Sequence, residues 1–249
     1  MSQGLKLFAA AGAALLVVAV MAGFSLVRTA EGGAETDPAN RAEIEAVVRD
    51  YILENPEILQ QAAQRLRQRE VAGAIEANRE ALETPFASAW AGNEDADVVL
   101  VEFFDYACPY CRRAHDDVQR LLSEDDNLKV VWRQMPVLGP GSRDAAEAAL
   151  AAAKAGRYRA YHNAMFEDPR RVTAEKAASI AGEVGLDSNA LVSAEDSQAI
   201  RAEIDTNLGL ARALGVSGTP AYFIGDQRID GAAGYDALKA AIAAARDAG

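Results

Sequence analysis

The pattern of apolar and polar positions from about residue 85 onward predicts an α/β domain. Residues 98–104 form a short and almost continuous apolar run, typical of a strand that is buried on both faces. A helix is expected over about 109–123, followed by a second strand over 129–134. This order makes a β-α-β unit whose two strands are parallel.

The rest of this region consists of a long helical stretch, a short hairpin and a last helix. Residues 142–214 are rich in alanine, and their character is helical almost throughout. Strands are expected over 221–224 and 227–229, on either side of a Gly-Asp pair that favours a two-residue turn. A last helix is expected over about 234–248. The fold class is therefore β-α-β, then a helical insertion over about 142–214, then β-β-α.

The N-terminus begins with a segment of a different kind. Residues 7–27 are an uncharged apolar run behind Lys6, long enough to span a bilayer as a helix. Val20 and Ala22 also offer a small-residue cleavage pattern, so residues 1–29 are either a signal peptide or a membrane anchor. Both alternatives place the remaining chain in an oxidising compartment, where disulfide chemistry is permitted.

Residues 30–37 are small and polar and indicate a linker, after which residues 38–84 indicate a helical extension. Asp37-Pro38 and Asn55-Pro56 are both helix-start signals. Apolar residues recur at helical spacing in each helix: Ile44, Val47, Val48, Tyr51 and Ile52, then Ile58, Leu59, Ala62, Ala63 and Leu66. Two such helices cannot bury an apolar stripe alone, so they pack on their own catalytic domain or associate with another copy.

Composition narrows the classes of function. The formal net charge of −12 argues against nucleic acid and against an anionic membrane surface as partners. The chain has only two cysteines and two histidines, which excludes a disulfide scaffold and makes a zinc array with many ligands implausible. The two cysteines are three residues apart, and they carry most of the chemical information in the chain.

The sequence Cys108-Pro109-Tyr110-Cys111 follows the first strand and opens a helix. Closing so short a loop would stabilise the fold little, so the pair is better suited to reversible redox chemistry than to a structural role. Cys108 falls at the helix N-cap, where unpaired backbone N–H groups and the helix dipole favour a thiolate. Cys111 should lie deeper and remain a thiol until it resolves a mixed disulfide.

Glu102 interrupts the apolar strand six residues before Cys108. A buried carboxylate is costly unless it is neutralised, paired or hydrated. Our hypothesis is that Glu102 lies beneath Cys111 as a proton acceptor whose pKa is raised by burial. The alternative is a carboxylate that reaches the edge of the sheet and is simply solvated.

A second motif, Val216-Ser217-Gly218-Thr219-Pro220, lies immediately before the strand at 221–224. A proline at the start of a strand leaves neighbouring backbone open for another chain to pair with. Base rates alone would make the Thr219–Pro220 bond trans.

A metal site is the rival interpretation of the cysteines. Cys108, Cys111 and His115 share one helical stripe, and His162 could supply a fourth ligand. We instead expect His115 to be exposed and His162 to pack between helices, with no metal bound. We expect Trp90 and Trp132 to be core residues.

Taken together, the stretch from Val101 to Cys111, the helical insertion and Gly218-Thr219-Pro220-Ala221 resemble the DsbA-like thiol–disulfide oxidoreductases of the bacterial envelope, over about residues 85–249. The resemblance implies a thioredoxin fold with an inserted helical domain and a location in the periplasm. It also implies that Cys108 is the nucleophile, Cys111 the resolving thiol and Glu102 the buried acid. Thr219-Pro220 would form a cis-proline loop that binds substrate together with Pro109 and Tyr110.

Residues 48–59 are similar to the helical extension of the suppressor-of-copper-sensitivity protein C branch. Some members of that branch oligomerise through the extension and act as disulfide isomerases. The resemblance therefore implies a self-associating isomerase or reductase that needs no cofactor besides the Cys108–Cys111 disulfide. Its partners would be unfolded or misoxidised exported proteins and a membrane redox protein.

Three alternatives remain open at this point. One is a monomeric oxidase of the DsbA type, although Tyr110 and Thr219 depart from that pattern. The others are an envelope chaperone or binding module with a structural disulfide, and a metal-handling protein.

Overall fold

The computed structural model describes residues 38–186 and 194–248. The expected signal peptide or anchor at 1–29 and the linker at 30–37 lie outside the described residues. The chain divides into two compact units, Met1–Ala62 and Ala63–Gly249, which we describe separately.

The described part of the first unit consists of helix α2 (Pro38–Glu54) and the beginning of α3 (Glu57–Glu83). The interruption falls at Asn55-Pro56, because proline has no N–H to continue the helix. Asn55 closes α2 with two hydrogen bonds to the Tyr51 carbonyl, from its backbone N–H at 3.0 Å and its side-chain amide at 2.8 Å. Two helices at these positions are what the sequence predicts. None of the helices in the described ranges is long and apolar enough to cross a membrane.

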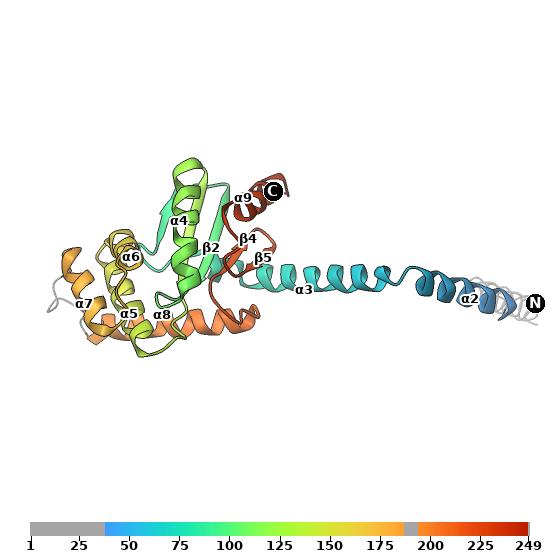
Figure 1. Cartoon of the computed structure of the whole chain (residues 1–249), viewed down its shortest axis with the longest axis horizontal. Coiled ribbons are helices and arrows are strands. Elements are labelled where there is room, and N and C mark those ends of the chain that lie inside the picture. The colour runs from blue at the N-terminus through green and yellow to red at the C-terminus, as the bar shows by residue number, and fades with distance from the viewer. Residues whose placement is uncertain (1–37, 187–193, 249) are drawn as a thin grey trace, which may run out of the picture. The chain divides into compact units, whose positions relative to one another are not determined.

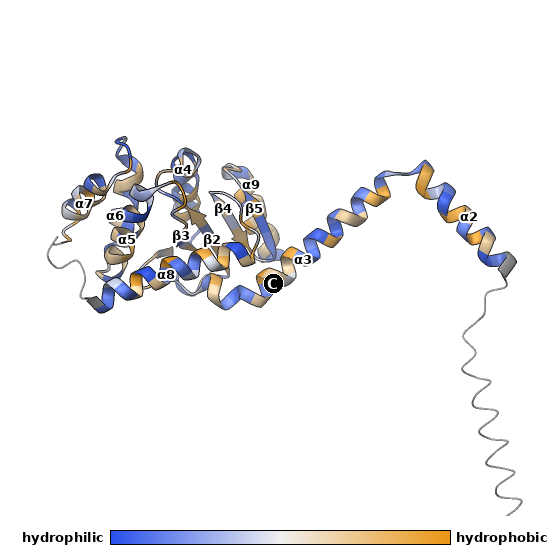
Figure 2. Cartoon of the chain, turned by 90° about the horizontal axis from the view of Figure 1, so that it is seen from below, coloured by the Kyte–Doolittle hydropathy of each residue, from blue (hydrophilic) through white to orange (hydrophobic). Residues whose placement is uncertain are grey.

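Helix α2 exposes much of its apolar side. Figure 2 shows hydrophobic residues recurring along it. Most of its large apolar side chains are about half exposed or more: Ile44, Val47, Val48, Tyr51 and Leu53.

The second unit is built on a five-stranded sheet whose order is β1-β3-β2-β4-β5. Figure 1 labels β2, β4 and β5 of this sheet. The strands are β1 (Trp90–Gly92), β2 (Val98–Phe104), β3 (Leu128–Gln134), β4 (Ala221–Ile224) and β5 (Gln227–Asp230). Strands β2 and β3 are parallel, and all other neighbouring pairs are antiparallel. Only β1 is absent from the sequence prediction, because a three-residue edge strand has too little periodicity to be recognised. Trp132 is buried as predicted, whereas Trp90, on this edge strand, is only partly buried.

The two faces of the sheet have separate hydrophobic cores. Leu100 and Phe104 of β2 face a core shared with α4 (Pro109–Glu124), α9 (Tyr235–Ala248) and part of the helical insertion. Val101 and Phe103 face the other core, which Ile75 and Leu82 of α3 help to form. This alternation explains why β2 reads as an apolar run, since both of its faces are buried.

The insertion comprises α5 (Pro140–Lys154), α6 (Tyr158–Glu167), α7 (Ala174–Glu183) and α8 (Ala194–Ala213). Its alanines account for the close packing, because Ala145, Ala149 and Ala152 of α5 are completely buried. The predicted fold class, a thioredoxin-like α/β domain with a helical insertion and N-terminal helices, is confirmed.

Arg133 of β3 attaches the end of α3 to this unit. Its side chain is 3% exposed. It donates hydrogen bonds to the carbonyl oxygens of Ala81, Leu82 and Thr84, and an ion pair of 2.9 Å joins it to Glu203. These carbonyls at the helix C-terminus would otherwise lack partners. The last turns of α3 are thus part of the folded second unit.

Candidate active site

The two cysteines lie at the start of α4, directly after the central strand β2 and a short loop. Cys108 is the N-cap residue, Pro109 is the first helical residue, and no side chain caps the helix. Both are free cysteines, and Cys111 is the more deeply buried, with 1% of its surface exposed against 5% for Cys108. The helix N-terminus and the relative depth agree with the sequence prediction.

Asp105 organises the loop that presents Cys108, and sequence reasoning missed it. Its side chain is buried, and one carboxylate oxygen accepts the N–H of Ala107 at 2.8 Å. The other oxygen accepts the N–H groups of Val137 and Leu138 at 2.8 and 3.0 Å. An aspartate directly after a strand is a signal for this kind of turn. One carboxylate therefore holds together the loop before Cys108 and the loop that follows β3.

The environment of Cys108 favours its anion. Its pKa is lowered to about 5, first because the Cys111 thiol donates a hydrogen bond to the sulfur. The Thr219 side chain and the backbone N–H groups of Tyr110 and Cys111 lower it further, while burial acts in the opposite direction. The pKa of Cys111 is raised by burial, by its hydrogen bond to Cys108 and by the nearby Glu102 carboxylate. The pair is thus divided into one thiolate and one thiol at neutral pH.

Glu102 lies in the middle of the sheet, since its strand β2 is flanked by β3 and β4. It is 3% exposed, so the alternative of a solvated carboxylate at the sheet edge is wrong. Burial raises its pKa to about 8. Its effect on the pKa of Cys111 indicates that the two groups are close.

Two aromatic residues beside Glu102 were not singled out as site residues by sequence reasoning. Trp132 lies opposite Glu102 on β3, and its indole N–H donates to the carboxylate at 3.0 Å. Tyr222 lies opposite Glu102 on β4, and its buried hydroxyl has no partner that meets hydrogen-bond geometry in the described chain. The signal that could have found them is strand register, which depends on pairing between distant segments.

The second motif meets the first at Cys108. The Thr219–Pro220 peptide bond is cis, so the trans expectation from base rates is wrong and the expectation from the resemblance is correct. In its protonated form, the Cys108 thiol donates to the Thr219 carbonyl at 3.3 Å. Tyr110 is 54% exposed, and the Arg113 guanidinium lies 4.5 Å from the centre of its ring. Pro109, Tyr110, Thr219 and Pro220 are therefore brought together around Cys108.

One of the two histidines lies where the sequence predicts it, and the other does not. His162 is buried between helices as predicted, and the Tyr106 hydroxyl lies 3.2 Å from its Nδ1. His115 is also buried, so the expectation that it is exposed is wrong. Its ring packs on Phe166 and lies 5.2 Å from that of His162, between centroids. Burial lowers the pKa of both imidazoles. Across the described ranges, no group of three potential metal ligands is found.

The fold and this cysteine site together define a DsbA-like domain. Residues 99–243 match the family model for the DSBA-like thioredoxin domain, and the chain belongs to this family. Residues 40–72 match a second model, the N-terminal domain of the copper resistance protein ScsC. The particular branch that the chain resembles is thus ScsC.

Solved structures support the same placement. A linker-deletion variant of Proteus mirabilis ScsC is 28% identical, and the match covers 88% of this chain and all of that one with a TM-score of 0.68. A thioredoxin-like oxidoreductase from Silicibacter pomeroyi is 41% identical, covering 69% of this chain and 99% of the other with a TM-score of 0.65.

Curated relatives are much longer proteins. A Na(+)/H(+) antiporter NhaA 1 from Salinispora arenicola is 32% identical over 158 residues, which are 62% of this chain. The chain spans about a quarter of the length of the curated relatives it matches.

Proposed function

We propose that this chain is a thiol–disulfide interchange protein of the cell envelope, which isomerises or reduces disulfides in exported proteins. The observation that carries the proposal is the difference in pKa between Cys108 and Cys111. The pKa of Cys108 is lowered to about 5, and that of Cys111 is raised. A thiolate is the nucleophile of disulfide exchange, and a sulfur of low pKa is also the better leaving group.

The reaction begins when the Cys108 thiolate attacks one sulfur of a client disulfide. A mixed disulfide forms, and the other client sulfur leaves as a thiolate. In isomerisation, that thiolate attacks a second client disulfide, and a client thiolate finally displaces Cys108, so no net electrons are transferred. In reduction, Cys111 loses its proton and attacks the Cys108 sulfur. The client then leaves as a dithiol, and the new Cys108–Cys111 disulfide must receive two electrons from a membrane redox partner.

Glu102 takes part in the reductive branch as the acceptor of the Cys111 proton. Burial raises its pKa to about 8, so about a tenth of Glu102 is ionised at pH 7, and this ionised fraction is a base of matched strength for the proton. A water molecule or direct contact would carry the proton between the two groups.

Substrate binds around the Cys108 sulfur, on Pro109, Tyr110, Thr219 and Pro220. Tyr110 and the nearby Leu138 are both more than half exposed, which suits an unfolded client that presents apolar side chains.

The second copy of the chain is the partner that best fits α2. Val47 and Tyr51 are 63% and 58% exposed, and they belong to one helical stripe that water would otherwise cover. Self-association through residues 38–56 buries this stripe. A second copy presents its own Cys108 thiolate to the same client, which favours isomerisation over a simple oxidase.

Reactivation of a scrambled-disulfide substrate tests the proposal on the full mature chain. Truncation through residue 83 is unsuitable, because the buried Arg133 would lose carbonyl partners that compensate the cost of burying its charge. The double variant Val47→Asp/Tyr51→Asp is the better probe. Ala42→Asp is its matched control, since Ala42 is exposed on the same helix but lies roughly 140° around it from Val47 at 3.6 residues per turn.

We expect the wild type and Ala42→Asp to be oligomers that reactivate the substrate, and Cys108→Ser to be inactive. The Val47/Tyr51 variant should be monomeric and lose most of the isomerisation while still reducing a simple disulfide. Undiminished reactivation by this monomer would refute the isomerase and support a monomeric oxidase or reductase. Suppression of aggregation without any turnover would support a chaperone.

A further inference from the structure

A pocket of about 400 Å³ opens beside Cys108, and it has no role in the steps described above. Three segments form its walls: residues 106–109 with Arg112, residues 138–142 at the start of α5, and residues 169–172 between α6 and α7. One wall thus contains the nucleophile, and the other two belong to the helical insertion. A substrate joined to Cys108 would place its neighbouring groups at this pocket.

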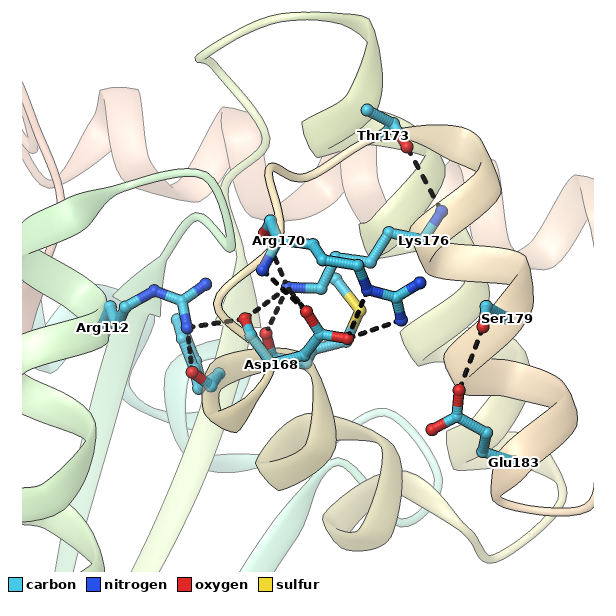
Figure 3. A network of polar contacts seen from close by, with 9 residues as sticks. Arg112, Asp168, Arg170, Thr173, Lys176, Ser179 and Glu183 are labelled. Atoms are coloured by element: carbon cyan, nitrogen blue, oxygen red, sulfur yellow. Dashed lines mark hydrogen bonds and ion pairs between the residues drawn. The ribbon is translucent and has the colours of Figure 1, made fainter.

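The charge of the pocket is opposite to that of the whole chain. Its lining contains three arginines, Arg112, Arg170 and Arg171, and no acidic residue. Figure 3 shows Arg112, Arg170 and Lys176 converging on the segment around Asp168. That single carboxylate pairs with Arg170 and with Lys176. The protein carries a net charge of −12, yet cations outnumber carboxylates here.

Neither Arg112 nor Arg171 forms an ion pair with a carboxylate among the described residues. Arg112 donates from one nitrogen to the backbone carbonyl oxygens of Phe166 and Asp168, the latter at 2.9 Å, and these are neutral acceptors. Arg171 is exposed and makes no hydrogen bond or ion pair within residues 38–186 and 194–248. The positive charge of the pocket is therefore only partly compensated.

The wall at the start of α5 adds a neutral backbone donor. The N-cap Gly139 has no side chain to cap the helix, and Pro140 follows it. Pro140 has no N–H, and the Ser142 N–H donates to the Gly139 carbonyl at 3.1 Å, so the Gly141 N–H is the first-turn donor that is left for an anion. Gly141 lets this turn approach the facing loop, because a Cβ there would lie 2.5 Å from the Val172 carbonyl oxygen.

Ser142 gives an independent indication that a ligand belongs here. It lines the pocket and is only 2% exposed, yet its hydroxyl has no hydrogen-bond partner among the described residues. A buried hydroxyl without a partner is costly. A ligand oxygen in the pocket would satisfy it.

From this juxtaposition we propose that the pocket binds a carboxylate group of the disulfide substrate, held by Arg171, Ser142 and the first turn of α5. The inference rests on the proposed function, because the sulfur of the same substrate must react with Cys108. The chemistry fits two sources: an acidic side chain near the cysteine of a client, and the free carboxylate of a small thiol. The pocket selects substrates by charge next to the reacting sulfur.

The test compares two disulfide-bonded peptides that differ only in Glu or Gln two residues from the cysteine. The second-order rate constant of their reaction with the full reduced chain is measured by stopped flow. We expect the Glu peptide to react about tenfold faster with the wild type, equivalent to about 1.4 kcal/mol, and the ratio to fall at high salt. Glutathione disulfide and its ethyl ester form a second pair that tests the small-molecule source.

Variants show whether the pocket causes the preference. The Glu-to-Gln rate ratio should approach one in Arg171→Gln and fall in Ser142→Ala, which changes no charge. Arg159→Gln is the control, because Arg159 is exposed on α6 outside the pocket and should leave the ratio intact. The urea midpoint of Ser142→Ala should not fall, which separates binding from a structural defect.

Each outcome has a distinct meaning. A preference in the peptide pair, or only in the glutathione pair, supports the carboxylate site and identifies its source. Equal rates within both pairs, with all four compounds reacting, overturn the site and leave the proposed function standing. Failure of every disulfide to react, while iodoacetamide still modifies Cys108, overturns the proposed function and the site with it.

Discussion

Replacing Glu102 with Gln tests the buried carboxyl on which the proton transfer depends. Glu102 is 3% exposed in the centre of the sheet, and burial raises its pKa from the ordinary 4.5 to about 8. Glutamine has nearly the same shape, and it cannot titrate. The variant therefore removes one ionisation while it retains the packing and an acceptor for the Trp132 indole N–H.

The magnitude follows from proton linkage. Between pH 4.5 and 8 the folded protein keeps a proton on Glu102 that the unfolded chain has released, so the stability from this group falls as pH rises. The contribution is complete below about pH 4.5 and is lost as pH passes 8. Each pH unit corresponds to about 1.4 kcal/mol, so the 3.5 units give at most about 5 kcal/mol.

Urea unfolding of the full chain from pH 4.5 to 8.5, in the disulfide form, measures this difference. The disulfide form is chosen because the lowered pKa of reduced Cys108 acts in the opposite direction: it adds stability as pH rises above about 5. We expect Glu102→Gln to gain stability relative to the wild type by several kcal/mol across this range. A difference between the two proteins that does not change with pH would refute a buried, protonated Glu102.

Three further variants test the surroundings of the same site. Cys111→Ala removes the largest cause of the lowered Cys108 pKa, so the pH midpoint of Cys108 alkylation should rise above 5; an unchanged midpoint would contradict this. Trp132→Phe removes a hydrogen bond that lowers the pKa of Glu102, so the pH at which Glu102 stops contributing to stability should rise in urea unfolding. The free energy of unfolding should fall by about 1–3 kcal/mol, because the Glu102 carboxyl loses its hydrogen-bond partner. Arg133→Met leaves the carbonyls at the end of α3 unpaired and should lower stability by about 3–5 kcal/mol in urea unfolding, whereas a loss below 1 kcal/mol would show that the buried cluster contributes little.

The sequence predicted the parts of the fold that depend on local periodicity. Strand β2 was placed correctly because both of its faces are buried, and α4 because Pro109 marks its first turn. The edge strand β1 was missed because its pairing with β3 is a tertiary contact. His115 was expected to be exposed, since a lone helical histidine gives no indication of the aromatic cluster that covers it.

The residues of the site also fall into those that local sequence predicts and those that only tertiary contacts bring together. Cys108 and Cys111 are adjacent in the chain, so their chemistry could be inferred from spacing and from the helix start. The contribution of Asp105 depends on a loop more than thirty residues away, at Val137 and Leu138. The pocket arginines come from α4 and from the loop after α6, so only the folded chain brings them together.

Alkylation of the reduced full chain with iodoacetamide as a function of pH tests the central claim most directly, because it reports the Cys108 thiolate itself. Mass spectrometry identifies the modified residue, and Cys108→Ser corrects for Cys111. The account predicts a midpoint near pH 5, which makes about three quarters of Cys108 ionised at pH 5.5, against about 0.1% for an ordinary thiol of pKa about 8.5. The lower nucleophilicity of a weakly basic thiolate offsets part of this advantage and leaves roughly twentyfold faster alkylation at that pH. A midpoint near pH 8.5 would contradict the account.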